Sequence, residues 1–173
     1  MDIWDPARCA CFTGHRQMDP AAMAAVSRPL IDRITELAAR GIVGYYAGGA
    51  LGFDFMAAIT VLNLKAVIPD LALTLALPCR GHMDRWRRED RALFSRVMDR
   101  ADRVVYVSEA YRPGCMQMRN RYMVDRSSVC LAYMTVCRGG TYQTVCYAEK
   151  KGIPVIRLTG ESVGEQISMP TEG

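Results

Sequence analysis

The sequence has few histidines, no metal-binding pattern and no paired-cysteine motif. His15 and His82 are the only histidines, and no His, Cys, Asp or Glu residues follow one another at metal-ligand spacing. We therefore expect no zinc site and no other bound metal. The seven cysteines are odd in number and include no Cys-x-x-Cys, so we interpret them, Cys79 included, as reduced thiols that pack inside a cytosolic protein.

Long apolar runs are also missing. The richest stretch, residues 55–77, is interrupted by Asn63, Lys65, Pro69 and Asp70, whereas a membrane-spanning helix needs ~20 apolar residues. The first residues, MDIWDPARC, contain early acids and no apolar core, so no signal peptide is expected. We predict a cytoplasmic protein with no membrane partner.

The composition is that of one globular domain. The chain has 173 residues, of which 50% are hydrophobic and 23% charged, and its net charge is +4. This length and apolar content suffice for one core, so we assign residues 1–160 to a single domain and residues 161–173 to a polar tail. Whether such a small domain associates into a homo-oligomer is left open.

Arginine is concentrated in one segment. Residues 80–126 hold twelve of the nineteen arginines, no lysine and seven acids, a local excess of five positive charges. Aromatic residues do not alternate with these arginines as they would in a surface that stacks single-stranded bases. We interpret the charges as a solvated helix face, so nucleic acid is not the expected partner.

Apolar runs of strand length alternate with segments of helix length. This alternation predicts an α/β fold in which a mostly parallel sheet carries helices on both faces. The expected strands are residues 8–13, 42–47, 71–77, 103–107, 129–134 and 153–158.

Five helices are expected between these strands. The first ends at Gly41, and its start is open between a cap at Asp19 with a kink near Pro29 and a later start at Ser27. The expected ranges of the others are residues 53–67, 84–101, 116–126 and 142–151. In the helix expected at residues 84–101, Trp86 and Leu93 are expected on the buried stripe.

Ligands of parallel sheets bind beyond the carboxyl ends of the strands, where backbone N–H groups of loops and helix ends are free. After the first strand comes Thr13-Gly14-His15-Arg16, which can approach a phosphate closely. The alternative, that Gly14 only allows a tight turn while His15 and Arg16 are solvated, is equally open.

The turn after the second strand carries a stronger signal. It contains Gly48, Gly49, Ala50 and Gly52, with Asp54 following in the first helical turn. Glycines let backbone amides turn toward an anion at a helix N-terminus, although the spacing is neither G-x-G-x-x-G nor a Walker loop. Asp54 is expected mainly as a helix-end acid and secondarily as a partner of a ribose hydroxyl.

A second glycine turn, Gly139-Gly140-Thr141, follows the fifth strand. Two such turns on one edge favour a ligand with two separated polar parts, as a nucleotide has, although two ordinary tight turns remain the alternative. On the fourth helix Arg119 and Arg121 point about 200° apart, so only one can face the site. Arg121 is spaced to pair with Asp125, which leaves Arg119 for the ligand.

These motifs in this order resemble the SLOG superfamily, and within it the YpsA-like branch. The segments that carry the resemblance are Phe12 to Arg16, Gly48 to Asp54, Arg119 to Asp125 with Asn120, and Gly139 to Thr141. The resemblance covers residues 8–158. It implies a single Rossmann-like domain that binds or senses a nucleotide or an NAD- or ADP-ribose-like derivative, in a bacterial branch linked with cell division and stress and without a defined activity. No cofactor is required.

Two other branches of the superfamily give alternatives. The LOG-type enzymes are nucleoside 5′-monophosphate phosphoribohydrolases that use an Arg on the fourth helix, matched by Arg119, and a Glu after the second glycine turn. Gln143 or Thr144 stands where that Glu is expected, which weakens the enzyme hypothesis and leaves no residue assigned to catalysis. The Smf/DprA branch implies single-stranded DNA binding, for which the arginine-rich segment is the motivation.

Overall fold

We describe residues 2–158 in a computed structural model, so the tail predicted for residues 161–173 lies outside the described residues. A short 3-10 helix, η1 (Pro6–Arg8), precedes the first strand. The strands are β1 (Cys9–Gly14), β2 (Gly44–Ala47), β3 (Ala72–Cys79), β4 (Arg103–Ser108), β5 (Val129–Tyr133) and β6 (Val155–Arg157). The helices are α1 (Pro20–Ala39), α2 (Phe53–Leu64), α3 (Arg88–Arg100), α4 (Cys115–Val124) and α5 (Gly139–Lys150).

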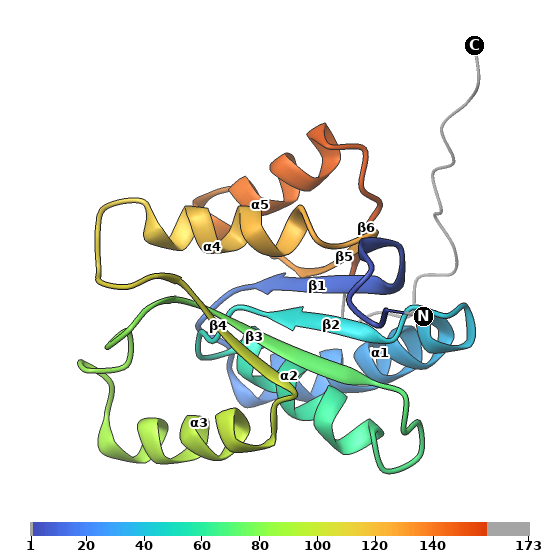
Figure 1. Cartoon of the computed structure of the whole chain (residues 1–173), viewed down its shortest axis with the longest axis horizontal. Helices are drawn as coiled ribbons and strands as arrows, with labels where there is room; N and C mark the ends of the chain where they lie inside the picture. The colour runs from blue at the N-terminus through green and yellow to red at the C-terminus, as the bar shows by residue number, and fades with distance from the viewer. Residues whose placement is uncertain (1, 159–173) are drawn as a thin grey trace.

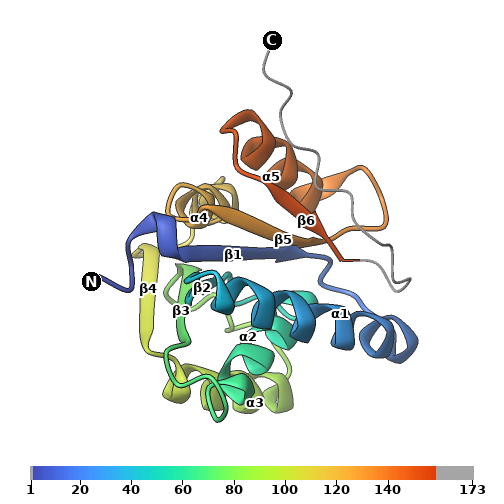
Figure 2. The ribbon, with the colours of Figure 1, turned by 90° about the vertical axis from the view of Figure 1, so that its right-hand side faces the viewer.

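All six strands form one parallel sheet in the order β4-β3-β2-β1-β5-β6. Helices α1, α2 and α3 cover one face, and α4 and α5 cover the other (Figures 1 and 2). The arrowheads of β1 and β2 both point to the left of Figure 1, which is the edge where the loops that follow the strands gather. The predicted α/β, Rossmann-like architecture is confirmed.

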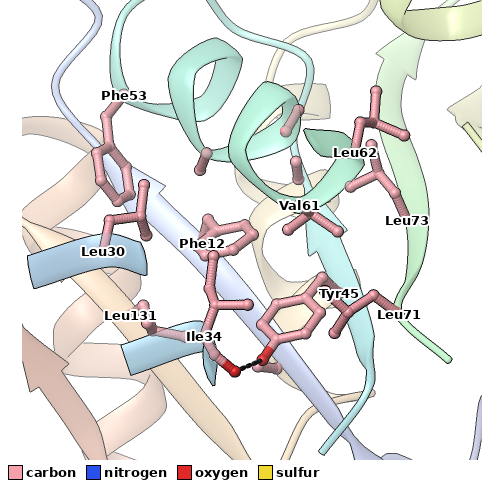
Figure 3. Packing of buried hydrophobic residues seen from close by; sticks show 14 of the residues in the cluster. Phe12, Leu30, Ile34, Tyr45, Phe53, Val61, Leu62, Leu71, Leu73 and Leu131 are labelled. Atoms are coloured by element: carbon pink, nitrogen blue, oxygen red, sulfur yellow. Dashed lines mark hydrogen bonds between the residues drawn. The ribbon is translucent and has the colours of Figure 1, made fainter. Parts of the chain in front are cut away.

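The larger of the two buried hydrophobic clusters lies between the sheet and the α1–α3 layer. Phe12 of β1 stacks on Tyr45 of β2 with ring centroids 5.5 Å apart. The Tyr45 hydroxyl donates to the carbonyl oxygen of Ile34 in α1 at 3.3 Å, the contact drawn in Figure 3. Because β1, β2 and β3 are buried along nearly their whole length, their continuous apolar runs are those of strands covered on both faces.

The structure decides between the two alternative starts of α1, and it places the start of α3 later than the sequence predicts. Helix α1 begins at Pro20, capped by the Asp19 side chain, and continues through Pro29. Helix α3 begins only at Arg88, because the preceding residues form turns, with Gly81 at φ +75° and a Trp86 N–H bond to the Met83 carbonyl. Trp86 still packs on the core from this turn segment.

The prediction that Leu93 lies on the buried stripe of α3 is wrong. Phe94 and Val97 are the buried side chains of this helix, whereas Leu93 is 48% exposed. All seven cysteines are unpaired, and five are buried while Cys137 and Cys146 are exposed.

Among the helices of residues 2–158, none has both the length and the apolar content that a membrane span requires.

Candidate functional site

The sheet order brings the two glycine turns together. Strands β2 and β5 both pair with β1, so the turns that follow them flank the loop that follows β1. The chain runs outward from β1 through β2, β3 and β4 on one side, and β5 and β6 lie on the other. This change of direction is the topological switch point at which open α/β sheets bind their ligands.

The loop after β1 connects both neighbouring turns. His15 Nε2 accepts a hydrogen bond of 2.8 Å from the Thr135 N–H in the loop that leads into α5. The His15 carbonyl accepts a 3.1 Å bond from the Phe53 N–H at the start of α2. His15 is therefore a structural link between loops, and of the two residues that the sequence left open only Arg16 is exposed.

Gly14 and Thr13 shape the start of this loop. Thr13 is buried, and a Cβ at Gly14 would lie 2.5 Å from the Phe53 Cβ, so the close packing of α2 on β1 needs glycine there. Arg16 Nη2 lies 3.7 Å from the Met116 sulfur in α4. Its guanidinium is thus held at the edge of the sheet between the two helix layers.

The turn after β2 is closed by two charged side chains of the chain itself. A Cβ at Gly48 would lie 2.5 Å from Arg119 Nη1 and 2.7 Å from Asp54 Oδ2. Arg119 Nη1 donates to the Gly48 carbonyl oxygen, and its Nε donates to Asn120 Oδ1 at 2.7 Å. Helix α4 is thereby tied to the turn after β2 across the carboxyl end of the sheet.

Asp54 and Arg119 are both almost fully buried, with exposed fractions of 6% and 4%. Burial raises the pKa of the Asp54 carboxyl, while the Arg119 guanidinium and the backbone N–H groups of Ala50 and Gly48 oppose the rise. Burial likewise lowers the pKa of Arg119, against the attraction of Asp54. The N–H groups of Gly48 and Ala50, which the sequence suggests for a phosphate, therefore favour the ionised form of the Asp54 carboxyl.

The other two glycines of this turn, Gly49 and Gly52, are packed against residues of other elements. Gly49 has φ +72°, and a Cβ there would overlap the Leu77 side chain and approach Phe94 Cζ to 3.1 Å. Gly52 has φ +77°, and a Cβ there would lie 2.6 Å from the His15 carbonyl oxygen. The turn after β2 is thus closely packed against its neighbours, and it fixes the position of the neighbouring loops.

The two glycines that begin α5, unlike those of the turn after β2, are open to solvent. Gly139 and Gly140 are exposed, and a Cβ on either would meet no heavy atom within 4 Å. The N-cap residue Arg138 makes no capping bond through its side chain. Thr141 is buried, and Thr144 Oγ1 donates back to the Gly140 carbonyl at 2.8 Å. This helix end leaves its first turn facing solvent.

The structure separates the two arginines of α4. Arg119 is buried, while Arg121 is exposed and lies with its guanidinium carbon 5.3 Å from the centroid of the Tyr147 ring. The predicted Arg121–Asp125 pair is wrong, because Lys151 and the Tyr147 hydroxyl occupy Asp125 at 3.1 and 2.8 Å. Residues of α5 therefore take the place of the i,i+4 partner.

One residue of this edge was not singled out from the sequence. His82, in the segment between β3 and α3, packs edge-on against Trp86 and Phe94 with centroids 5.4 and 5.8 Å away. Burial lowers the pKa of its imidazole, and Nε2 has no hydrogen-bond partner within residues 2–158. A Cβ on Gly49 would lie 3.6 Å from this nitrogen. Only the fold, and no spacing in the sequence, brings His82 to the glycine turn.

A groove of about 530 Å³ opens on the α1–α3 side of the same edge. Its walls include the apolar side chains Met18, Met23, Leu51, Phe55 and Leu93. Arg16 and Gly52 line it too, so the groove is continuous with the loops already described. Its volume lies within the range of small-molecule sites in proteins.

Comparison with known proteins agrees with this arrangement. The family model described as the YspA SLOG family matches residues 11–151. The chain is 29% identical over 118 residues to the uncharacterized SPbeta prophage-derived protein YoqJ of Bacillus subtilis, covering 61% of this chain and 69% of that protein. It is 30% identical over 101 residues to a UPF0398 protein of Staphylococcus saprophyticus, covering 57% of this chain and 54% of that one.

Solved structures with the same fold include two DNA processing proteins A. The protein from Helicobacter pylori, described by its single-stranded DNA binding mode, has a TM-score of 0.62 and 18% identity over 95% of this chain and 68% of its own. That from Streptococcus pneumoniae has a TM-score of 0.64 and 14% identity over 93% of this chain and 53% of its own. This chain thus spans about half the length of the pneumococcal and the staphylococcal proteins.

The parallel sheet, its switch point and the two glycine turns define a SLOG-type Rossmann-like protein. The chain belongs to the YspA SLOG family.

Proposed function

We propose that the protein binds a nucleotide or a nucleotide derivative such as ADP-ribose at the carboxyl edge of the sheet, with phosphate between Arg16 and the amino end of α5. The observation that carries the proposal is the open first turn of α5 next to the switch point. A helix N-terminus offers unpaired N–H groups and a positive dipole end to an anion. The exposed Arg16 adds a guanidinium whose planar fork suits phosphate.

In this proposal the closed turn shapes the site. Asp54 and Arg119 pack against Gly48, and Asn120 orients Arg119. Thr13, Gly14 and His15 set the path that brings Arg16 to the edge. Asp54 is only 6% exposed, so a ribose hydroxyl could reach it only over a small area.

Replacing Gly140 with Asp is expected to weaken binding of ADP-ribose at least about tenfold, because a carboxylate near the phosphate repels it. The new side chain finds free space and an acid suits a first helical turn, so the fold should be as stable as the wild type. Isothermal titration calorimetry with ADP-ribose, NAD and GDP, together with thermal unfolding, measures both effects.

Gly140→Ala is the matched control, because it adds a Cβ at the same place without charge. It should bind as the wild type does. Equal affinity of Gly140→Asp and Gly140→Ala would contradict the phosphate position, and no binding of any of the three nucleotides by the wild type would contradict the proposed function.

Hydrolysis of a nucleoside 5′-monophosphate is a separate outcome of the same experiments. Thr144 is buried and engaged with Gly140, and Gln143 cannot supply a carboxylate, so Asp54 is the acid nearest to the turn that Arg119 holds. Glycosidic cleavage needs a carboxylate beside the sugar. Release of free base from AMP or CMP that Asp54→Asn abolishes would establish an enzyme.

Single-stranded DNA binding is the second candidate, and two observations favour it. The fold is shared with the Helicobacter pylori protein that binds such DNA. In addition, Arg85, Arg88, Arg91 and Arg96 are exposed and form no salt bridge with any residue between positions 2 and 158. They lie on α3 and the segment before it, away from the open end of α5.

This candidate predicts that affinity for a labelled oligo-dT falls steeply and linearly with the logarithm of salt concentration. The Arg88→Ala/Arg91→Ala double variant should reduce the slope by about two, one for each phosphate contact removed. Fluorescence anisotropy between 50 and 300 mM salt measures the slope. No binding at the lowest salt would exclude this function.

A further inference from the structure

The groove beside the closed turn has the properties of a base subsite, an inference that rests on the proposed nucleotide function. The groove and the phosphate position share Arg16, which lines the groove and also reaches Met116 on the other side of the sheet edge. A nucleotide with its phosphate at Arg16 can therefore extend into the groove. The apolar walls and the volume of about 530 Å³ suit a planar heterocycle and its ribose.

The mouth of the groove includes an apolar side chain that the core does not use. Leu93 projects from α3 with 48% of its surface exposed, although the neighbouring Phe94 is fully buried. A large exposed apolar residue on the wall of a groove marks a surface that a ligand can cover. Phe55, tilted against Phe94 with centroids 6.4 Å apart, supplies an aromatic part of the wall.

The groove also contains one available carboxylate. Two acids line it, Asp19 and Asp90. The Asp19 side chain accepts a 2.7 Å bond from the Ala22 N–H as the cap of α1, so it is in use. Asp90 is partly buried, and none of the salt bridges within residues 2–158 involves it.

We propose that this groove binds the base of the nucleotide and that Asp90 selects guanine over adenine. An ionised carboxylate only accepts hydrogen bonds. Guanine presents two adjacent donors, N1–H and the 2-amino group, which match the two oxygens of a carboxylate. Adenine presents one donor and one acceptor on the corresponding edge, and its N1 lone pair faces the carboxylate unfavourably.

The test compares GDP with ADP by calorimetry on the full chain. The wild type should bind GDP about tenfold or more tightly than ADP, as one good bidentate base contact implies. Asp90→Asn should lose this preference and gain affinity for ADP, because an amide pairs one acceptor and one donor with adenine. Leu93→Glu should weaken binding of both nucleotides about tenfold by placing a charge on the apolar wall.

Glu89→Gln is the control. Glu89 lies in the same turn of α3 as Asp90, but it is outside the groove and highly exposed. It should leave the GDP to ADP ratio unchanged. If the wild type binds both nucleotides without preferring GDP, or if Leu93→Glu binds GDP as well as the wild type does, the base subsite is wrong and the nucleotide function stands. If the wild type binds neither GDP nor ADP but does bind ADP-ribose or NAD, the base subsite alone is wrong. If it binds none of these four nucleotides, both proposals are overturned.

Discussion

Replacing Arg119 with methionine is expected to lower the free energy of unfolding by about 3–5 kcal/mol. The substitution fills the space of the aliphatic part of Arg119 and leaves Asp54 buried without its cation. It also removes the donor to the Gly48 carbonyl, which ties α4 to the turn after β2. Urea denaturation at pH 7 measures the loss.

The loss should depend on pH. Because burial raises the pKa of Asp54 in the folded protein above its unfolded value of about 3.9, the group favours folding in its protonated form. That contribution is complete below about pH 3.9 and disappears as pH rises through the folded pKa. Removing Arg119 raises the folded pKa further, so the destabilisation should be smaller at pH 5 than at pH 8.

Two variants test this explanation. Adding Asp54→Asn to Arg119→Met should recover part of the lost stability and remove the pH dependence, since the uncompensated carboxylate is gone. Arg121→Met, on the same helix with an exposed guanidinium, should change stability by no more than about 0.5 kcal/mol. Equal losses at residues 119 and 121 would show that the buried pair has no special role.

Much of the architecture could be predicted because it depends on local patterns. Continuous apolar runs identify strands buried on both faces, and their alternation with helices fixes a parallel sheet. The conserved geometry of such sheets then places the loops after β1, β2 and β5 at one edge, as observed. The left-handed Gly41 after α1 was also visible from the sequence, with φ +86° in the structure.

The state of each loop could not be predicted, because it depends on contacts between distant residues. The bond from Thr135 to His15 spans 120 positions, and that from Arg119 to Gly48 spans 71. Two glycine turns that look alike in the sequence differ for this reason: Asp54 and Arg119 fill one, and nothing fills the other. Binding of an anion is thus expected at the turn with fewer glycines, contrary to what glycine content alone suggests.

The same contrast gives a direct test of the closed turn. Gly52→Ala is expected to lower the free energy of unfolding by about 2–5 kcal/mol, the sum of backbone strain at positive φ and overpacking. Gly52 has φ +77°, and an added Cβ would overlap the Arg16 carbonyl and lie 2.6 Å from that of His15. These are backbone atoms, so relief requires the loop after β1 to move and the Phe53 bond to His15 to lengthen.

Gly139→Ala is the comparison without a crowded Cβ. Gly139 also has a positive φ, +81°, and no atom within 4 Å of an added Cβ, so this variant should lose only about 1–2 kcal/mol. Parallel denaturant titrations give the difference, which reports the contact between the loops after β1 and β2 together with the additional strain of Gly52, whose ψ of −126° lies outside the left-handed α region. If the two variants lost equal stability, the loop after β1 would yield easily at residues 15 and 16. Arg16 would then lack the fixed position from which it is proposed to hold phosphate.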